Sequence, residues 1–188
     1  GTAVITFQQA FRHQKFIQDA TAGILIDDNS GTITTTYNLY DGISNIIGTV
    51  AEYGGMMQLT PIADPGPAVS TGNVIIPQEI SLNELVTNFE QYESELVRVM
   101  GVYFDNAESG LTFTNGTLYP MNNGLMNFRT TFYDVDYIGM TVPTGLWNII
   151  GIPNSRVIEG NLFTARCWAD FSSAGIVLPS PVVNISVQ

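Results

Sequence analysis

The sequence is poor in basic residues, with six Lys and Arg against 17 Asp and Glu in 188 residues, and its net charge is −11. The deficit is even, because residues 1–80 carry two basic and seven acidic groups and residues 81–188 carry four and ten. Tight binding to a polyanion normally needs a cationic field that releases counterions. The composition therefore argues against broad nucleic-acid binding, while a small local cationic patch stays compatible with it.

Cysteine and histidine are almost absent, with one Cys167 and one His13. A lone cysteine excludes a disulfide within these residues, and we expect Cys167 to be a small buried apolar side chain in a strand over 161–171. A cysteine nucleophile needs a neighbouring base, and His13 is far away in the sequence. No phosphate-binding glycine loop, nucleophile elbow or zinc-protease motif occurs. We therefore predict no catalytic residues, no metal site and no cofactor, and expect a protein that is not an enzyme.

Long apolar runs are also missing. No stretch approaches the ~18 consecutive apolar residues of a membrane-spanning helix, so we expect no transmembrane segment. A signal peptide is not present either, and the chain opens on "GTAVITF", as a protein does once its export signal is removed. Charged residues make up only 12%, which suits a secreted β-rich protein. We expect an exported protein at an extracellular or cell-surface location.

What is present is alternation of apolar and polar residues between turn signals, which predicts strands. Gly23 is expected to permit a bend or bulge, and Gly54 with Gly55 to form a turn. The Pro- and Gly-rich segment 63–73 marks the end of a first unit. The strands expected in this unit cover residues 4–11, 15–19, 23–28, 43–53 and 56–62.

One helix is predicted within residues 76–93. Ser81 and Glu84 have the spacing of a capping box, in which each side chain accepts a hydrogen bond from a free backbone N–H group. An apolar stripe at helical spacing consists of Leu82, Leu85, Val86 and Phe89.

A second run of strands follows, including a hairpin over 110–122 with its turn at Asn115–Gly116. The tail, residues 172–188, either returns as an edge strand or leads to something beyond. The other strands expected here cover residues 95–104, 127–134, 137–142, 146–152 and 161–171.

The phrase "NIIG" occurs twice, at 45–48 and 148–151, 103 residues apart. A glycine-containing turn precedes each copy, and a polar turn and a closing strand follow each. Solenoid repeats have periods of about 20–50 residues, so this spacing predicts tandem domains; the alternative is chance repetition of a generic strand and turn. Small all-β units avoid exposed edges by closing into barrels. In such a barrel the glycine of each phrase would allow strong coiling.

The stretch "FIQDATAGILIDD…DGISNIIGTVAEYGGMMQLTPIADPG" resembles OB-fold modules of secreted and surface-anchored proteins of Bacteroidetes-type bacteria, the DUF5689-like and extracellular-nuclease-associated OB families. The second half resembles a companion module but has "FRTTFYD" in place of the Ile-Gln-Asp phrase. The resemblance implies an all-β fold of two tandem OB-like, five-stranded Greek-key β-barrels, with module 1 at 1–76, a linker helix at 77–95 and module 2 with a tail at 96–188. The residues that carry it are Phe16, Ile17, Gln18, Asp19, Gly23, Ile24, Gly48, Tyr53, Gly55, Gln58, Leu59 and Pro61.

OB folds bind ligands with the loops that join strands 1–2 and 4–5. The expected first loop carries Phe11, Arg12, His13 and Lys15, and Tyr53 would lie across the same groove. Aromatic rings beside cations are the chemistry of single-stranded nucleic-acid binding. The alternative is a solvated loop. In module 2 the corresponding candidate is Arg156, with pairing to a carboxylate as the alternative.

Other ligand classes stay open. Asp27, Asp28, Asn29 and Ser30 could hold a hard cation or form an ordinary Asx turn; Asp134 and Asp136 form a second acidic pair, with a solvent-facing role as the alternative. We expect a non-catalytic binding or accessory module for an oligonucleotide; the alternatives are a glycan-binding module or a structural, protein-adhesion spacer within a larger surface protein. Candidate rings for stacking on a sugar are Tyr37, Tyr40, Tyr53, Tyr92, Tyr103, Trp147 and Trp168.

Overall fold

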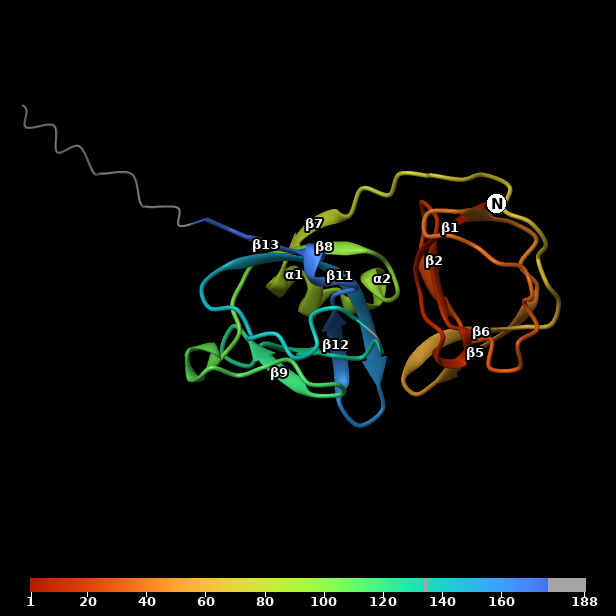
Figure 1. Cartoon of the computed structure of the whole chain (residues 1–188). Helices are drawn as coiled ribbons and strands as arrows, with labels where there is room; N and C mark the ends of the chain where they lie inside the picture. The colour runs from red at the N-terminus through yellow and green to blue at the C-terminus, as the bar shows by residue number, and fades with distance from the viewer. Residues whose placement is uncertain (134, 176–188) are drawn as a thin grey trace, which may run out of the picture.

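The computed structural model describes residues 1–133 and 135–175. The chain is mostly β, with two sheets and a few short helices. Figure 1 shows the first sheet, in red and orange, beside the second, in green to blue, with an extended segment running between them. The prediction of an all-β fold is confirmed at this level.

The first sheet has the strand order β4-β1-β2-β3-β6-β5. Strands β3 and β6 pair in parallel, and every other neighbouring pair is antiparallel. The five expected strands are present, but the fourth begins at Gly48 and not at Ile43, because Asn45 has a positive φ of 57° that interrupts the extended backbone. The strands are β1 (Ala3–Gln8), β2 (Lys15–Gln18), β3 (Gly23–Ile26), β4 (Gly42–Ile43), β5 (Gly48–Tyr53) and β6 (Met56–Pro61).

The second sheet has the order β7-β8-β11-β12-β10-β9, and β13 also pairs with β11. It repeats the central pairings of the first sheet, because β10 and β12 are parallel and β11 and β12 are antiparallel. A bridge between Phe104 and Met121 brings β9 back beside the chain that leaves β8. The strands are β7 (Gln78–Ser81), β8 (Val97–Val102), β9 (Leu118–Met121), β10 (Met126–Arg129), β11 (Trp147–Arg156), β12 (Gly160–Thr164) and β13 (Phe171–Ser173).

The two glycines of the repeated phrase occupy equivalent positions. Gly48 begins β5 and Gly151 lies within β11. A Cβ atom at Gly48 would collide with the Thr60 carbonyl oxygen, and one at Gly151 with the Thr164 carbonyl oxygen. In both sheets the repeated glycine therefore lets the backbone of the following strand approach closely.

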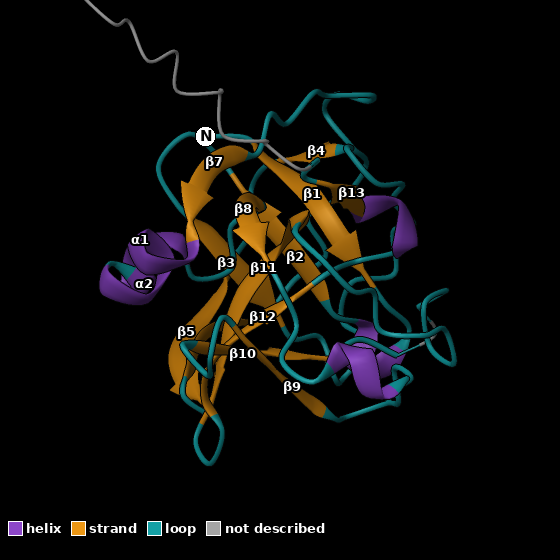
Figure 2. Cartoon of the chain, turned by 90° about the vertical axis from the view of Figure 1, so that its left-hand side faces the viewer, coloured by secondary structure: helices purple, strands orange, loops and turns teal. Residues whose placement is uncertain are grey.

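The helical prediction over 76–93 is confirmed only from residue 82 onward. The start of the segment is strand β7, and helices α1 (Leu82–Thr87) and α2 (Phe89–Tyr92) follow; Figure 2 shows the two helices together beside β7. The Ser81 Oγ accepts a hydrogen bond from the Glu84 N–H group at 3.1 Å, so the predicted N-cap is confirmed. The second hydrogen bond of the capping box, from the Ser81 N–H group to the Glu84 side chain, is wrong. The Glu84 carboxylate accepts from Asn88 and Tyr92 instead.

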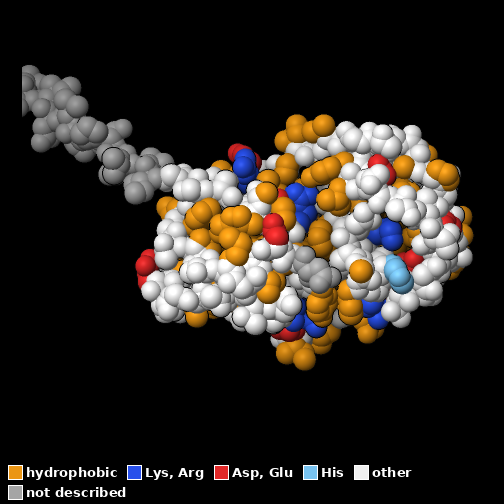
Figure 3. Space-filling model, viewed as in Figure 1, with side chains coloured by type: hydrophobic (Ala, Val, Ile, Leu, Met, Phe, Trp, Pro, Cys, Tyr) orange, Lys and Arg blue, Asp and Glu red, His pale blue; other side chains and the backbone are white. Residues whose placement is uncertain are grey.

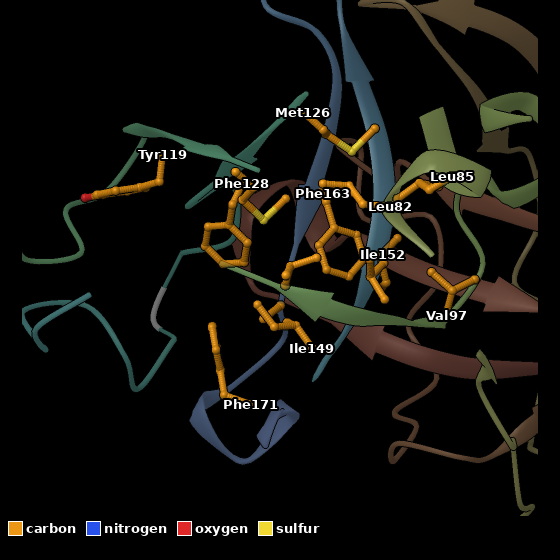
Figure 4. Packing of buried hydrophobic residues seen from close by; sticks show 14 of the residues in the cluster. Leu82, Leu85, Val97, Tyr119, Met126, Phe128, Ile149, Ile152, Phe163 and Phe171 are labelled. Carbon is orange, nitrogen blue, oxygen red and sulfur yellow. The ribbon is translucent and has the colours of Figure 1, made fainter. Parts of the chain in front are cut away.

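The apolar stripe of the helix is confirmed in three of its four residues. Leu82, Leu85 and Phe89 are buried, whereas Val86 is exposed. Figure 4 shows Leu82 and Leu85 beside the apolar side chains of the second sheet. Within residues 1–133 and 135–175, no helix is long and apolar enough to cross a membrane.

Two strand predictions in the second half are wrong. The hairpin of β9 and β10 turns at residues 122–125, where Asn122, Asn123 and Gly124 have positive φ, and not at Asn115–Gly116. Residues 137–142 form turns and an isolated bridge because Tyr137 and Val142 are drawn into the core.

The expectation for Cys167 is also wrong. Its side chain is half-buried and lies outside any strand, ahead of the short 3₁₀ helix η3 (Trp168–Asp170). The end of the tail, residues 176–188, lies outside the described residues.

Four strands of the first sheet, β1, β2, β3 and β6, divide their apolar residues between two cores. In β2, Ile17 faces the interior of the first sheet and Phe16 faces the second sheet. Phe132 from the second sheet stacks on Phe7 with ring centroids 4.1 Å apart and meets Phe16 edge-on at 5.5 Å. The two sheets therefore share one continuous apolar core.

Polar contacts fix the two sheets relative to each other. The Arg166 guanidinium forms a bidentate ion pair with Asp170, and its Nη1 donates to the Thr6 carbonyl oxygen at 2.9 Å and to the Tyr40 hydroxyl at 3.2 Å.

Gly23 pairs regularly with Gln18, so the expected bulge is wrong. A Cβ at Gly23 would collide with the Ser94 carbonyl group, and the glycine is needed for this close approach.

Candidate ligand-binding cleft

A cleft of about 590 Å³ lies between the two sheets. Figure 3 shows hydrophobic side chains together with Lys and Arg side chains along the junction of the two parts. Four of the six residues predicted from the sequence line the cleft, namely Phe11, Arg12, Tyr53 and Arg156. His13 and Lys15 are not among its lining residues.

The cleft has an apolar floor and an aromatic rim. The floor contains buried side chains that belong to the shared core. On the rim, Phe11 is 47% exposed, Tyr133 is 48% exposed and Tyr53 is 67% exposed. The Phe11 and Tyr133 rings lie at a tilt of 44° with centroids 4.8 Å apart, which is a favourable arrangement of aromatic side chains. The floor residues are Phe16, Leu25, Met56 and Phe132.

The loop between β1 and β2 is held in a fixed shape. It contains the 3₁₀ turn η1 (Phe11–His13), and Arg12 and His13 both adopt positive φ values. The Gln9 side chain donates to the Gln14 side chain at 2.7 Å, and its Oε1 accepts from the Tyr133 N–H group at 3.0 Å. The loop of one sheet is thereby tied to the other sheet at the rim of the cleft.

Arg12 is paired with a carboxylate of the protein. Its Nε donates to both carboxylate oxygens of Asp27 at 2.9 Å, and Nη2 lies 2.7 Å from Oδ2. The hydrogen bonds to Asp27 raise the pKa of the Arg12 guanidinium. The guanidinium carbon also lies 5.9 Å from the centre of the Tyr53 ring, within the range of a cation–π contact. Arg12 therefore presents a planar polar surface whose charge Asp27 compensates.

His13 and Lys15 face a different region. The His13 Nδ1 lies 3.2 Å from the Asp28 carbonyl oxygen, and the Lys15 ammonium donates to the His13 carbonyl oxygen at 3.0 Å. Lys15 is buried, and this burial lowers the pKa of its ammonium group. Successive residues of a strand point to opposite faces, so Lys15 shares the inner face of β2 with Ile17. The structure thus separates Arg12 from His13 and Lys15, although all three lie within four residues of the sequence.

Two short turns meet at the other side of the cleft. The β5–β6 turn carries Gly54 and Gly55, and a Cβ at Gly55 would lie 3.3 Å from the backbone of Arg156 and Val157 in the β11–β12 hairpin. Val157 and Ile158 at the hairpin tip are exposed. The hairpin therefore completes the cleft wall.

Arg156 at the base of this hairpin contacts Glu159, with 3.3 Å between its Nε and the carboxylate. The predicted alternative for this residue, pairing with a nearby carboxylate, is therefore what the structure contains.

The oxygen atoms proposed for a cation have other partners. Asp28 is fully buried, and its two oxygens accept from the Thr32 and Ile33 N–H groups at 2.7 and 2.9 Å. These bonds reach four and five residues along the chain, so they are not the Asx turn that was the alternative, in which the donor lies two residues on. Asp136 accepts from the Trp168 N–H group, whereas Asp134 lies outside the described residues. In the part of the chain that the structure describes, no cluster of three or more His, Cys, Asp or Glu side chains could hold a metal ion.

Sequence reasoning found Arg156 and missed most of the other residues that the second sheet contributes. Tyr133, Asn154 and Glu159 line the cleft, and no local pattern placed them near Phe11. The sequence feature that could have indicated Tyr133 is the adjacent aromatic pair Phe132 and Tyr133, which lies inside an expected strand. Of the candidate rings for sugar stacking, Tyr37 and Tyr92 are buried, so that part of the set is wrong.

The chain was compared with protein-family models, with curated proteins and with solved structures, and none of the three comparisons found a match.

Proposed function

We propose that the chain is a non-catalytic binding module that holds a saccharide in the cleft between its two sheets. One observation carries this proposal. Three exposed aromatic rings, those of Phe11, Tyr53 and Tyr133, surround a cleft in which Arg12 and Arg156 each contact a carboxylate.

This arrangement suits the chemistry of a sugar. The C–H faces of a pyranose ring pack on aromatic rings, and its hydroxyl groups both donate and accept hydrogen bonds. Ligand sites of this kind combine apolar surface with a few fixed polar groups. Besides the two Arg–carboxylate pairs, the polar groups that line the cleft include Gln9, Gln14, Gln58, Asn154 and Ser155.

The same contacts weigh against the oligonucleotide that the sequence favoured. A groove for single strands follows the phosphates with uncompensated cations. Asp27 compensates Arg12, and His13 and Lys15 lie outside the cleft lining. An oligonucleotide is therefore the competing outcome of the test below.

The proposal includes the architecture and location expected from the sequence. We propose that each sheet is an OB-like, partly open barrel of an exported or surface protein. The parallel pairings β3–β6 and β10–β12 support a Greek-key strand order. The cleft is lined by the β1–β2 loop and the β5–β6 turn, which are the loops that OB folds use for ligands.

The test is affinity electrophoresis of the purified chain in gels that contain xylan, mannan, galactan, β-glucan or polygalacturonate. A parallel titration uses fluorescent single-stranded oligonucleotides at low and moderate salt. We expect retardation by at least one saccharide. Tyr53→Ala should weaken it by about tenfold, or roughly 1.4 kcal/mol, because it removes a stacking surface.

The control is Ile62→Ala, which shortens an equally exposed apolar side chain outside the cleft lining; it should leave binding unchanged. Oligonucleotide binding that weakens with salt would replace the proposal, and absence of retardation in every gel would refute it.

A further inference from the structure

Two arginines and one glutamate lie together near the hairpin end of the cleft, where Arg156 and Glu159 are lining residues and Arg129 is not. Arg129 at the end of β10 and Arg156 at the end of β11 both face Glu159. The Arg129 Nε lies 3.7 Å from Glu159 Oε1, and the Arg156 Nε lies 3.3 Å from Oε2. Two guanidinium groups therefore share one carboxylate.

Arg129 is incompletely satisfied. Its side chain is only 12% exposed, and its Nε is buried with no hydrogen-bond partner among the residues that the structure describes. The closest hydroxyl contact, from Nη1 to Thr131 Oγ1, is 3.5 Å long, at the outer limit for a hydrogen bond. Burying a polar donor without an acceptor is unfavourable, so the site lacks an acceptor.

The two guanidinium groups are close enough to affect each other. Burial lowers the pKa of the Arg129 guanidinium, and the positive charge of Arg156 lowers it further, while Glu159 opposes both. Two guanidinium groups together present more N–H donors than one carboxylate can accept. An additional anion at this end of the cleft would supply acceptors and balance the charge.

We infer that the bound saccharide carries a carboxylate, as a uronic acid does, and that this carboxylate is received by Arg156 beside Arg129. The inference rests on the proposed function and names the class of sugar. A planar carboxylate matches the planar fork of a guanidinium in a bidentate pair. Arg156 shares Glu159 with Arg129, so its charge is only partly compensated and suits a single carboxylate, whereas a continuous polyphosphate would meet compensated charge at Arg12 and a net charge of −11 on the chain.

The experiment compares probes that differ only in charge, by isothermal titration calorimetry with the full chain. Polygalacturonate is compared with its methyl ester, and glucuronoxylan with its carboxyl-reduced form. We expect each acidic form to bind about tenfold more tightly than its neutral counterpart, the order of one charge-assisted hydrogen bond.

Three variants test which residue causes the preference for the acidic saccharide. Arg156→Gln should abolish the preference for the acidic form over the neutral form. Glu159→Gln should strengthen binding of the acidic form, because the ligand no longer competes with a protein carboxylate. Arg98→Gln is the control, since Arg98 pairs with Glu79 on β7 and β8 outside the cleft lining. Thermal denaturation of each variant checks that it is folded.

The outcomes separate the inference from the proposal it rests on. Equal affinity for charged and neutral forms would overturn the inference and leave saccharide binding intact. A preference that survives in Arg156→Gln would place the carboxylate elsewhere and overturn it as well. If no saccharide of either kind bound, both would fail.

Discussion

Single glycines determine how closely backbones approach each other in this protein. At Gly23 the neighbour is the Ser94 carbonyl group in the turn between α2 and β8, and at Gly48 and Gly151 it is the adjacent strand. None of these three has a positive φ. The glycine is therefore required by lack of space for a side chain and not by backbone conformation.

Gly23→Ala should destabilise the protein by about 1–3 kcal/mol, the usual effect of overpacking a close contact. The added methyl group would push Ser94 away and separate the two sheets locally. Urea denaturation measures the change. Gly54→Asn serves as the comparison, because Gly54 has open space around it and a φ of 67°, which asparagine tolerates. Equal stability of Gly23→Ala and the parent chain would contradict the close contact.

At the scale of elements, the segment after β6 is tied back to the first sheet by one carboxylate. Asp64 accepts hydrogen bonds from the Gly66 N–H group, from both the N–H and hydroxyl groups of Thr34, and from the Thr35 N–H group, all between 2.7 and 2.9 Å. These bonds, with that from Gly66 first, hold the pKa of Asp64 far below its usual value. The carboxylate form is therefore the one that stabilises this loop.

Asp64→Asn should lower the thermal midpoint at neutral pH. A depressed pKa in the folded state contributes stability above the unfolded pKa of about 3.9, and this contribution is lost as the pH falls toward the folded pKa. The difference between parent and variant should therefore be largest at pH 6–8 and narrow below about pH 4. Thermal melts monitored by circular dichroism across this range measure it. A difference that stayed constant with pH would contradict the role of the charge.

Elements were predictable where the signal was local. The alternating patterns predicted β1, β2, β3 and β6 closely, and the Ser81–Glu84 pair predicted the start of α1. Asn115 and Gly116 do form a turn, but the hairpin predicted around it is wrong because Phe113 pairs with Met140 and enters the core. The pairing of Phe113 depends on Met140, which is 27 positions away, and cannot be predicted from the neighbouring sequence.

The cleft was predictable only in its first half for the same reason. The loop with Phe11 and Arg12 followed from local composition, and Tyr53 followed from the expected fold. Tyr133 reaches the rim through a hydrogen bond to Gln9, which is 124 residues away. The pairing of Arg12 with Asp27 likewise depends on how β2 and β3 lie together, and it is one reason for proposing a saccharide in place of an oligonucleotide.

At the scale of the whole molecule, the shared core makes the two sheets one cooperative unit. Phe7, Phe16, Leu25 and Met56 of the first sheet belong to the same apolar cluster as the interior of the second. Both tryptophans, Trp147 and Trp168, lie in the second half, so their fluorescence reports on that half alone. Circular dichroism reports on both.

Phe132→Ala should lower the free energy of unfolding by about 3–5 kcal/mol, as is usual for a buried phenylalanine. It removes the ring that stacks on Phe7 and should let the two halves unfold separately. In the parent chain, fluorescence and circular dichroism should give one coincident urea transition; in the variant the two probes should diverge. Two separate transitions in the parent chain would rule out a shared core.

The contact between the β5–β6 turn and the β11–β12 hairpin sets the distance between the two sides of the cleft. Gly55 contacts the backbone of Arg156 and Val157. The width of the cleft is therefore set by the length of these two short turns and not by the packing of either core. Lengthening one turn by a residue should widen the opening while both sheets stay as they are. The width of the cleft, and with it the size of molecule that fits, should therefore be adjustable through loop length alone, without affecting folding.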